Sequence, residues 1–207
     1  KQISYSMASN VVKAVKWPRL CYRNHFDKVW LTGLVYKLHT MGIRSKRLRI
    51  VNSTLRGTEG KFFMIVDAKP FNIDQGTRQG SSCAPFYYTV YINDLLKDLS
   101  ASTYGSTSER YPLSAPTQAD DIVLLSLSRK DLQEMLDMCR NYANRWRYTY
   151  NPAMCSSMLK DRRQRQNTPL PVLRYEESLI QENPTYTHLG IVQSSSGKYP
   201  CNIDDVR

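Results

Sequence analysis

The chain has 207 residues and contains no hydrophobic run long enough to cross a membrane. Its first residues, KQISYSM, lack the apolar core of a signal peptide, and the chain begins with Lys, so we expect a fragment of a longer protein. The five cysteines include no C-x-x-C pair, and the three histidines are equally dispersed. These spacings argue against a zinc site or a disulfide framework and favour a reducing, intracellular setting.

Acidic residues are few relative to basic ones. Asp and Glu total 18 against 29 Lys and Arg, which gives a net charge of +11. This surplus favours polyanionic partners, with nucleic acid before acidic membrane. Two basic clusters stand out, although a solvated surface would explain both equally well: Arg44, Lys46, Arg47 and Arg49, then Lys160, Arg162, Arg163 and Arg165.

Apolar spacing predicts four helices, at about 31–41, 45–55, 85–99 and 128–146. The second helix is strongly basic, and Ser128 with Asp131 forms a capping-box-like start to the fourth. The apolar stripe predicted for the first helix is Leu31, Leu34, Val35, Leu38 and Met41.

Strand patterns occur in KFFMIV (61–66) and FNID (71–74), which form a predicted hairpin, and in DIVLLSLS (121–128). CSSML (155–159) and several short segments near the C-terminus read as further strands. There are no internal repeats, and a hydrophobic content of 41% is enough for one core. We therefore expect a single α+β domain over 1–207, with helices behind a small antiparallel sheet.

The clearest chemical signal is a pair of acids, Asp120 and Asp121, at the start of the apolar strand. Adjacent carboxylates at the mouth of a buried strand need a compensating charge. An Asp-Asp pair alone is more often a surface turn. Here the pair follows a Gly- and Ser-rich loop that opens a helix (DQGTRQGSSCAP, 74–85), and the whole chain is basic.

Four segments together resemble the palm motifs of reverse transcriptases, most closely those of LINE-like non-LTR retrotransposons. The segments are HFDKVWLTGLVYKLHTMGI, RQGSSCAPFYYTVYINDLL, ADDIVLLS and YTHLGI, in that order, and the resemblance covers about residues 20–193. It implies a right-hand polymerase palm with part of the fingers and without a thumb. It also implies RNA-directed DNA polymerase activity, with an RNA template, a DNA primer and deoxynucleoside triphosphates as partners.

The resemblance implies a role for each motif. Two Mg²⁺ ions would neutralise the acids and clamp the attacking hydroxyl and the departing pyrophosphate, with Asp120 as the main ligand and Asp121 beside it. Three further groups carry expected roles: Arg78, Gln79 and Gly80 in the nucleotide-binding loop; Phe26 as the steric gate against a 2′-hydroxyl; and His188, Leu189 and Gly190 in the primer grip. A helix-entry loop, a core phenylalanine and an ordinary turn are the respective alternatives.

The sequence departs from the family at two chemical positions. Cys21 stands where the family's first catalytic Asp is expected, six residues before Asp27, and Trp17-Pro18 interrupts the strand that should lead to it. Met154 stands where a Lys is thought to protonate pyrophosphate. A thiol is a poor Mg²⁺ ligand and a thioether cannot donate a proton.

These losses leave three interpretations of the chain. We expect a reverse transcriptase domain that is inactive in this copy. The first alternative is a non-catalytic nucleic-acid-binding remnant of a decayed transposon. The second is a pseudogene product that does not fold stably.

Overall fold

The computed structural model describes residues 12–16, 28–56, 59–60, 71–72, 75–77, 81–106, 113–118, 121–148, 150, 152, 155–160, 172–188 and 191–195. Among the segments that the sequence predicts, the strand at 61–66 and the basic residues at 162–165 lie outside these described residues. Lys160 ends a described strand.

A five-stranded sheet is built around the apolar strand that follows the paired acids. That strand is β5 (Asp121–Ser126), and the strand order is β4-β5-β1-β6-β9. The other strands are β4 (Thr117–Gln118), β1 (Val12–Lys16), β6 (Ser156–Lys160) and β9 (Gln181–Glu182). All neighbours are antiparallel except β6 and β9, which pair in parallel. The predicted α+β class is confirmed, and most of this sheet is antiparallel as expected.

Three short hairpins complete the described strands. They are β2 (Glu59–Gly60) with β3 (Phe71–Asn72), β7 (Arg174–Tyr175) with β8 (Ser178–Leu179), and β10 (Thr185–His188) with β11 (Ile191–Ser194). The first of them pairs the two residues that precede the predicted 61–66 strand with the first two residues of the predicted 71–74 strand.

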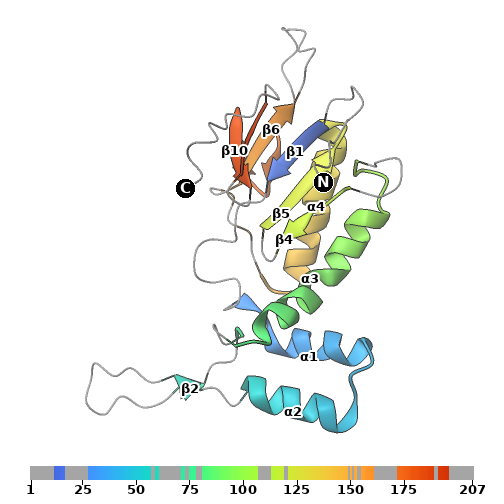
Figure 1. Ribbon diagram of the computed structural model, residues 1–207, viewed down its shortest axis with the longest axis vertical. Helices are drawn as coiled ribbons and strands as arrows, with labels where there is room; N and C mark the ends of the chain where they lie inside the picture. The colour runs from blue at the N-terminus through green and yellow to red at the C-terminus, as the bar shows by residue number, and fades with distance from the viewer. Residues whose placement is uncertain are drawn as a thin grey trace, which may run out of the picture.

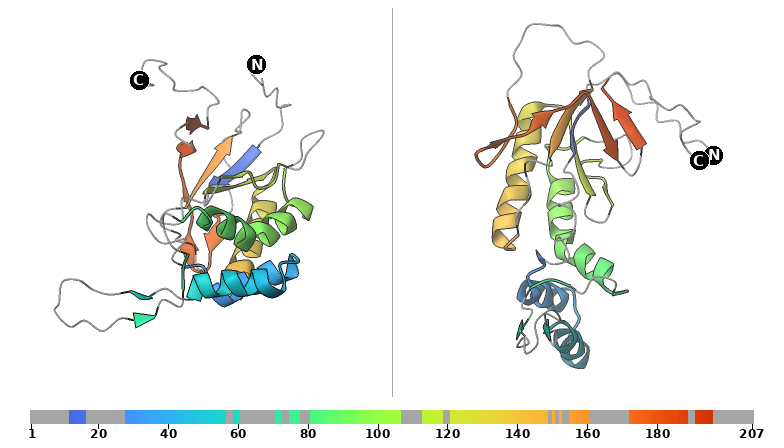
Figure 2. Two further views of the ribbon diagram at one scale, coloured as in Figure 1. Left: turned by 60° about the horizontal axis from the view of Figure 1, so that its bottom comes forward. Right: turned by 90° about the vertical axis from the view of Figure 1, so that its left-hand side faces the viewer.

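Two long helices cover the sheet. They are α3 (Ala84–Ala101) and α4 (Arg129–Arg145), and Figure 2 shows both on one side of the sheet. The predicted cap of α4 is confirmed, because the Ser128 side chain accepts a hydrogen bond from the Asp131 amide at 3.0 Å. The apolar stripe of α4 is buried against β5 and β1 as its spacing predicts, at Leu132, Met135, Leu136, Cys139 and Ala143.

The first two helices are α1 (Leu31–Thr40) and α2 (Ser45–Arg56). They lie side by side, run in opposite directions and sit beyond the N-terminal end of α3 (Figure 1). α1 packs between α2 and α3. Leu31, Leu34 and Leu38 are buried as predicted. Met41 is not, since it follows the last turn of α1 and is 56% exposed. The buried stripe instead includes Lys37, which is 2% exposed.

Candidate active site

Asp121 is held at the turn end of a β-hairpin. It is the first residue of β5 and pairs with Gln118, the last residue of β4. Its side chain is buried at 5% exposure, and the three residues after it are buried as well. Only two residues, Ala119 and Asp120, separate the paired positions, and both lie outside the described residues. The apolar strand therefore anchors Asp121 at the end of the sheet, as the paired-acid pattern requires.

The strand β1 runs antiparallel beside β5 and ends at the same end of the sheet. Lys13 pairs with Ser126 and Lys16 pairs with Val123, so the chain moves toward Asp121 as it leaves β1. β1 ends immediately before Trp17-Pro18, where the sequence predicts an interruption. Cys21 follows outside the described residues, so its expected position facing Asp120 stays a prediction.

Two segments that flank the predicted nucleotide contacts are bonded to each other. The Gly76 amide donates to the Val29 carbonyl at 2.9 Å, and the Gln75 side-chain amide donates to the Lys28 carbonyl at 3.2 Å. Trp30 and Gln75 also form an isolated β-bridge. The first segment follows Phe26 and Asp27, and the second precedes Arg78, Gln79 and Gly80, all outside the described residues. The steric-gate motif and the nucleotide loop thus emerge from one bonded pair of segments.

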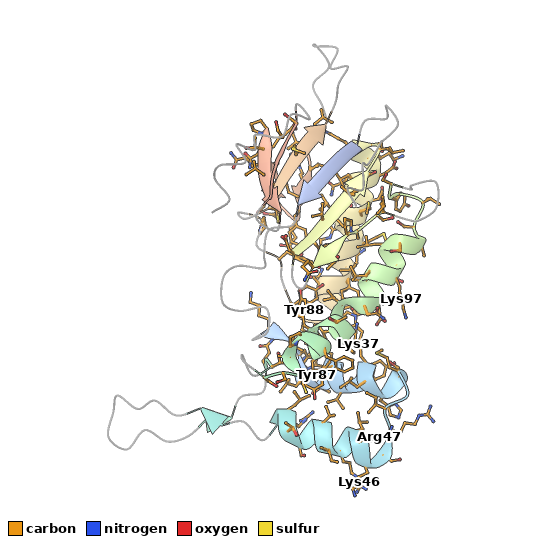
Figure 3. All side chains as sticks on the ribbon, in the orientation of Figure 1. Lys37, Lys46, Arg47, Tyr87, Tyr88 and Lys97 are labelled. Carbon is orange, nitrogen blue, oxygen red and sulfur yellow. The ribbon has the colours of Figure 1, made fainter. Side chains whose placement is uncertain are left out.

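The residues at the start of α3 follow the predicted nucleotide-binding loop in the sequence. Phe86 is 52% exposed, and its ring centroid lies 5.9 Å from that of Tyr87. Burial, with a smaller contribution from Cys83, raises the pKa of Tyr87. Tyr88, the next residue, is buried in the core (Figure 3). The helix that follows the nucleotide loop is therefore anchored by one tyrosine and presents aromatic surface from the two residues before it.

The sequence analysis missed a buried lysine behind this region. The Lys37 Nζ donates a hydrogen bond to the Tyr91 carbonyl at 2.6 Å and another to the Tyr142 hydroxyl. It also forms an ion pair with Asp94 at 2.9 Å. Burial lowers the pKa of Lys37, and the hydrogen bond and charge of Asp94 oppose that shift. Figure 3 shows Lys37 between α1 and α3.

Aromatic rings surround the Lys37 ammonium. Its Nζ lies 3.9 Å from the centroid of the Trp146 ring, 4.7 Å from that of Tyr142 and 5.5 Å from that of Tyr91. The Tyr91 hydroxyl in turn donates to the Trp146 carbonyl. One cation therefore joins α1, α3 and the C-terminal end of α4. These helices belong to, or directly follow, three of the four motif segments. The signal in the sequence was the position of Lys37 on the stripe of Leu34 and Leu38.

The predicted primer-grip segment lies in a hairpin. His188 ends β10 and pairs with Ile191, the first residue of β11. Leu189 and Gly190 connect the two strands and lie outside the described residues. The two paired strands on either side are described, and the role of His188 in holding a primer stays a prediction.

Among the residues that the structure describes, no group of three or more His, Cys, Asp or Glu side chains is placed to hold a metal ion. Asp121 is the one member of the expected Mg²⁺ ligand set that is described. Within the same described ranges, no helix is long and apolar enough to span a membrane.

The comparisons with known proteins agree with this arrangement. Residues 20–196 match the family of reverse transcriptases (RNA-dependent DNA polymerases), which is most of the chain. The chain belongs to this family.

Two curated relatives are RNA-directed DNA polymerases of a mobile element. The chain is 27% identical over 180 residues to the RNA-directed DNA polymerase from mobile element jockey of Drosophila funebris, covering 83% of this chain and 19% of the relative. It is 27% identical over 191 residues to the Drosophila melanogaster protein of the same name, covering 88% and 20%. The chain thus spans about a fifth of the length of these relatives.

A solved structure supports the fold. Apo telomerase from Candida tropicalis, truncated from its C-terminal domain, superimposes with a TM-score of 0.60 and 11% identity, over 90% of this chain and 34% of that one. At this identity the likeness concerns the fold alone, and the predicted polymerase palm is confirmed.

Proposed function

We propose that the chain is a single reverse transcriptase domain of a jockey-like non-LTR retrotransposon, and that nucleotidyl transfer has been lost in this copy. In the parent activity, an RNA template directs the addition of deoxynucleoside triphosphates to a DNA primer inside the cell. The observation that carries the proposal is the buried Asp121 at the β4–β5 turn, with β1 ending at the same end of the sheet.

The residues at the expected metal site do not fit two Mg²⁺ ions. Mg²⁺ requires hard oxygen donors in octahedral geometry. Asp120 and Asp121 supply such donors, whereas Cys21 would supply one soft sulfur that is mostly protonated at neutral pH. We therefore propose no reaction step through a metal in this chain. The loss of Lys at Met154 removes the expected proton donor as well.

The remaining site residues keep their proposed roles in nucleotide and primer binding. Phe26 and the Arg78-Gln79-Gly80 loop would contact the incoming nucleotide, and the hydrogen bonds between 28–30 and 75–77 support their proximity. His188, Leu189 and Gly190 would contact the primer from the β10–β11 hairpin.

A second function is favoured by the charge of the chain. A net charge of +11 on a chain with a lost metal ligand suits a non-catalytic remnant that binds nucleic acid through its phosphates. This remnant and the inactive polymerase domain predict the same behaviour in the unrepaired chain. They differ in whether repairing the site restores chemistry.

The test is a repair experiment in a chimera that supplies fingers and thumb from a jockey polymerase. Cys21→Asp and Met154→Lys are introduced singly and together, and primer extension is measured on an RNA template. We expect no extension from the unrepaired chimera and extension from the double repair. Removal of a side chain that binds the metal directly typically costs orders of magnitude in rate, so Cys21→Asp should have the larger effect.

Two controls make the result specific. Cys201→Asp introduces the same chemical change beyond the matched residues and should restore nothing. Asp121→Asn in the double repair should abolish extension again, while Mn²⁺ binding by Cys21→Asp gives a readout independent of activity. An unrepaired chimera that extends primer as well as the double repair would show that Cys21 is not the catalytic position, with Asp27 as the next candidate.

A further inference from the structure

The two helices α1 and α2 belong to a segment without a single acidic residue. From Lys28 to Arg56 the sequence contains no Asp or Glu, and its basic residues are Lys28, Lys37, Arg44, Lys46, Arg47, Arg49 and Arg56. Lys37 is buried and paired with Asp94 of α3. Four of the others lie within six residues, in the sequence RSKRLR, and all four are exposed. We define these four residues, Arg44, Lys46, Arg47 and Arg49, as the α2 basic surface.

The apolar side of α2 is already occupied. Leu55 is buried, and the partly buried Leu48 and Val51 pack against the same core through α1. The basic side chains project from the remaining circumference of the helix, and Figure 3 shows Lys46 on the side away from α1. α2 therefore already packs against α1 through its apolar side, and the α2 basic surface is the side that this packing leaves exposed.

The charges of this surface have no local compensation in the described part of the chain. The ion pairs among the described residues involve Lys37, Arg129 and Arg140 and none of these four side chains, and the first turn of α2 contains no acid. Like charges at three- and four-residue spacing repel each other, and cations near the start of a helix oppose its dipole. Folding alone gives no reason for such a cluster, whereas an anionic partner would stabilise it.

The location separates this surface from the candidate active site. α1 lies between α2 and the rest of the domain, and the sheet with Asp121 lies beyond α3 and α1 (Figure 1). A strand of nucleic acid held on the outer side of α2 would therefore run outside the predicted site for nucleotide addition.

We propose that the α2 basic surface is an accessory docking site for the sugar-phosphate backbone of nucleic acid. Three of its four cations are arginines, whose planar guanidinium groups suit phosphate. A membrane-surface helix needs a free apolar face, and that of α2 is packed on α1, with Ile50 its one large exposed apolar residue among those described. The inference rests on the proposed function only in taking nucleic acid as the partner.

The experiment measures binding of the 207-residue chain to labelled single-stranded RNA, single-stranded DNA and duplex by fluorescence anisotropy over a range of salt concentrations. The test variant is Lys46→Gln, Arg47→Gln and Arg49→Gln together, because Gln keeps the helix propensity of Lys and Arg. The matched control is Lys97→Gln, Lys130→Gln and Arg174→Gln, which removes the same charge from exposed positions on α3, α4 and β7. Thermal melts verify that all chains are folded.

We expect the test variant to bind about 10- to 100-fold more weakly near 0.1 M salt, and its slope of log affinity against log salt to be shallower by about two. The control variant should retain more of the affinity and more of the salt slope than the test variant. Equal losses in the two variants, or an unchanged slope in the test variant, would overturn the proposal. So would selective binding of acidic vesicles over RNA and DNA. Because primer extension by the repaired chimera is measured separately, failure here leaves the proposed polymerase ancestry intact.

Discussion

The ammonium group of Lys37 lies over the indole ring of Trp146, 3.9 Å from the ring centroid. Lys37 lies on α1, and Trp146 immediately follows the last residue of α4. The two are separated by more than half the chain. This contact attaches the first helices of the domain to its core. Aromatic rings enclose the Lys37 ammonium, whereas the neighbouring buried positions of α1, Leu34 and Leu38, are leucines.

Replacement of Lys37 tests whether its charge or its volume stabilises this joint. Lys37→Ala should lower the free energy of unfolding by about 2–4 kcal/mol, because it leaves a cavity among the surrounding rings, while the Tyr142 hydroxyl still donates to the Tyr91 carbonyl. Lys37→Met keeps most of the volume and should cost less than about 1.5 kcal/mol, since Asp94 is 54% exposed and can be solvated. Urea unfolding measures both. Lys97→Ala, an exposed control on α3, should be near neutral, and equal costs for Ala and Met would show that the charge itself is required.

Gly33 allows α1 to approach two indole rings. A Cβ atom at this position would lie 2.6 Å from a Trp30 ring carbon and 3.1 Å from one of Trp146. Gly33→Ala should therefore destabilise the domain by about 1–3 kcal/mol despite the better helix propensity of Ala. His39→Ala on the exposed side of α1 is the control. In a Trp30→Leu background the cost of Gly33→Ala should shrink, and an unchanged cost in that double-mutant cycle would argue against the steric explanation.

The cap of α4 is a local interaction with a defined size. Ser128→Ala removes the side-chain acceptor of the Asp131 amide and should cost about 1 kcal/mol in thermal or urea unfolding. Ser100→Ala provides a matched control, because Ser100 lies exposed near the end of α3. This control should be neutral or slightly stabilising. A neutral Ser128→Ala would mean that water replaces the cap without loss.

Alkaline pH should destabilise the domain. Burial raises the pKa of Tyr91 to about 12 and that of the Cys155 thiol to about 12, and it raises the pKa of five further tyrosines: Tyr87, Tyr142, Tyr148, Tyr150 and Tyr175. Above the ordinary values of 9.0 for Cys and 10.0 for Tyr, the unfolded chain loses these protons while the native chain keeps them. Stability from these groups is therefore complete below those values and falls as pH rises through them.

Lys37 changes the stability in the opposite direction, over the pH range just below 10.5. Its pKa is lowered below 10.5, so the native chain binds fewer protons than the unfolded chain up to that pH, and its contribution to stability rises. Six tyrosines and one cysteine oppose this single lysine, so the net result should be a fall in stability. Urea unfolding at increasing pH measures stability, and phenolate absorbance follows the tyrosines. Complete ionisation of the tyrosines near pH 10.0 in folded protein would contradict the prediction.

Local pattern was sufficient for much of the fold. The spacing of Leu132, Met135, Leu136 and Cys139 specified both α4 and its buried face, and the apolar run after Asp121 specified β5, because periodicity and burial act residue by residue. Motif order also led to the reverse transcriptase family, which the match over residues 20–196 confirms.

Only the tertiary structure decided which segments meet. The pairing of β1 with β5, the parallel pairing of β6 with β9 and the bonds between 28–30 and 75–77 join residues far apart in the chain, and no local period encodes a partner. The same limit explains Lys37 and Met41. Periodicity put Met41 inside, although α1 ends before it, and the charge of Lys37 argued against a buried position. Its burial is possible because Asp94, Tyr91, Tyr142 and Trp146 converge on it from α3 and α4, and that convergence exists only in the folded chain.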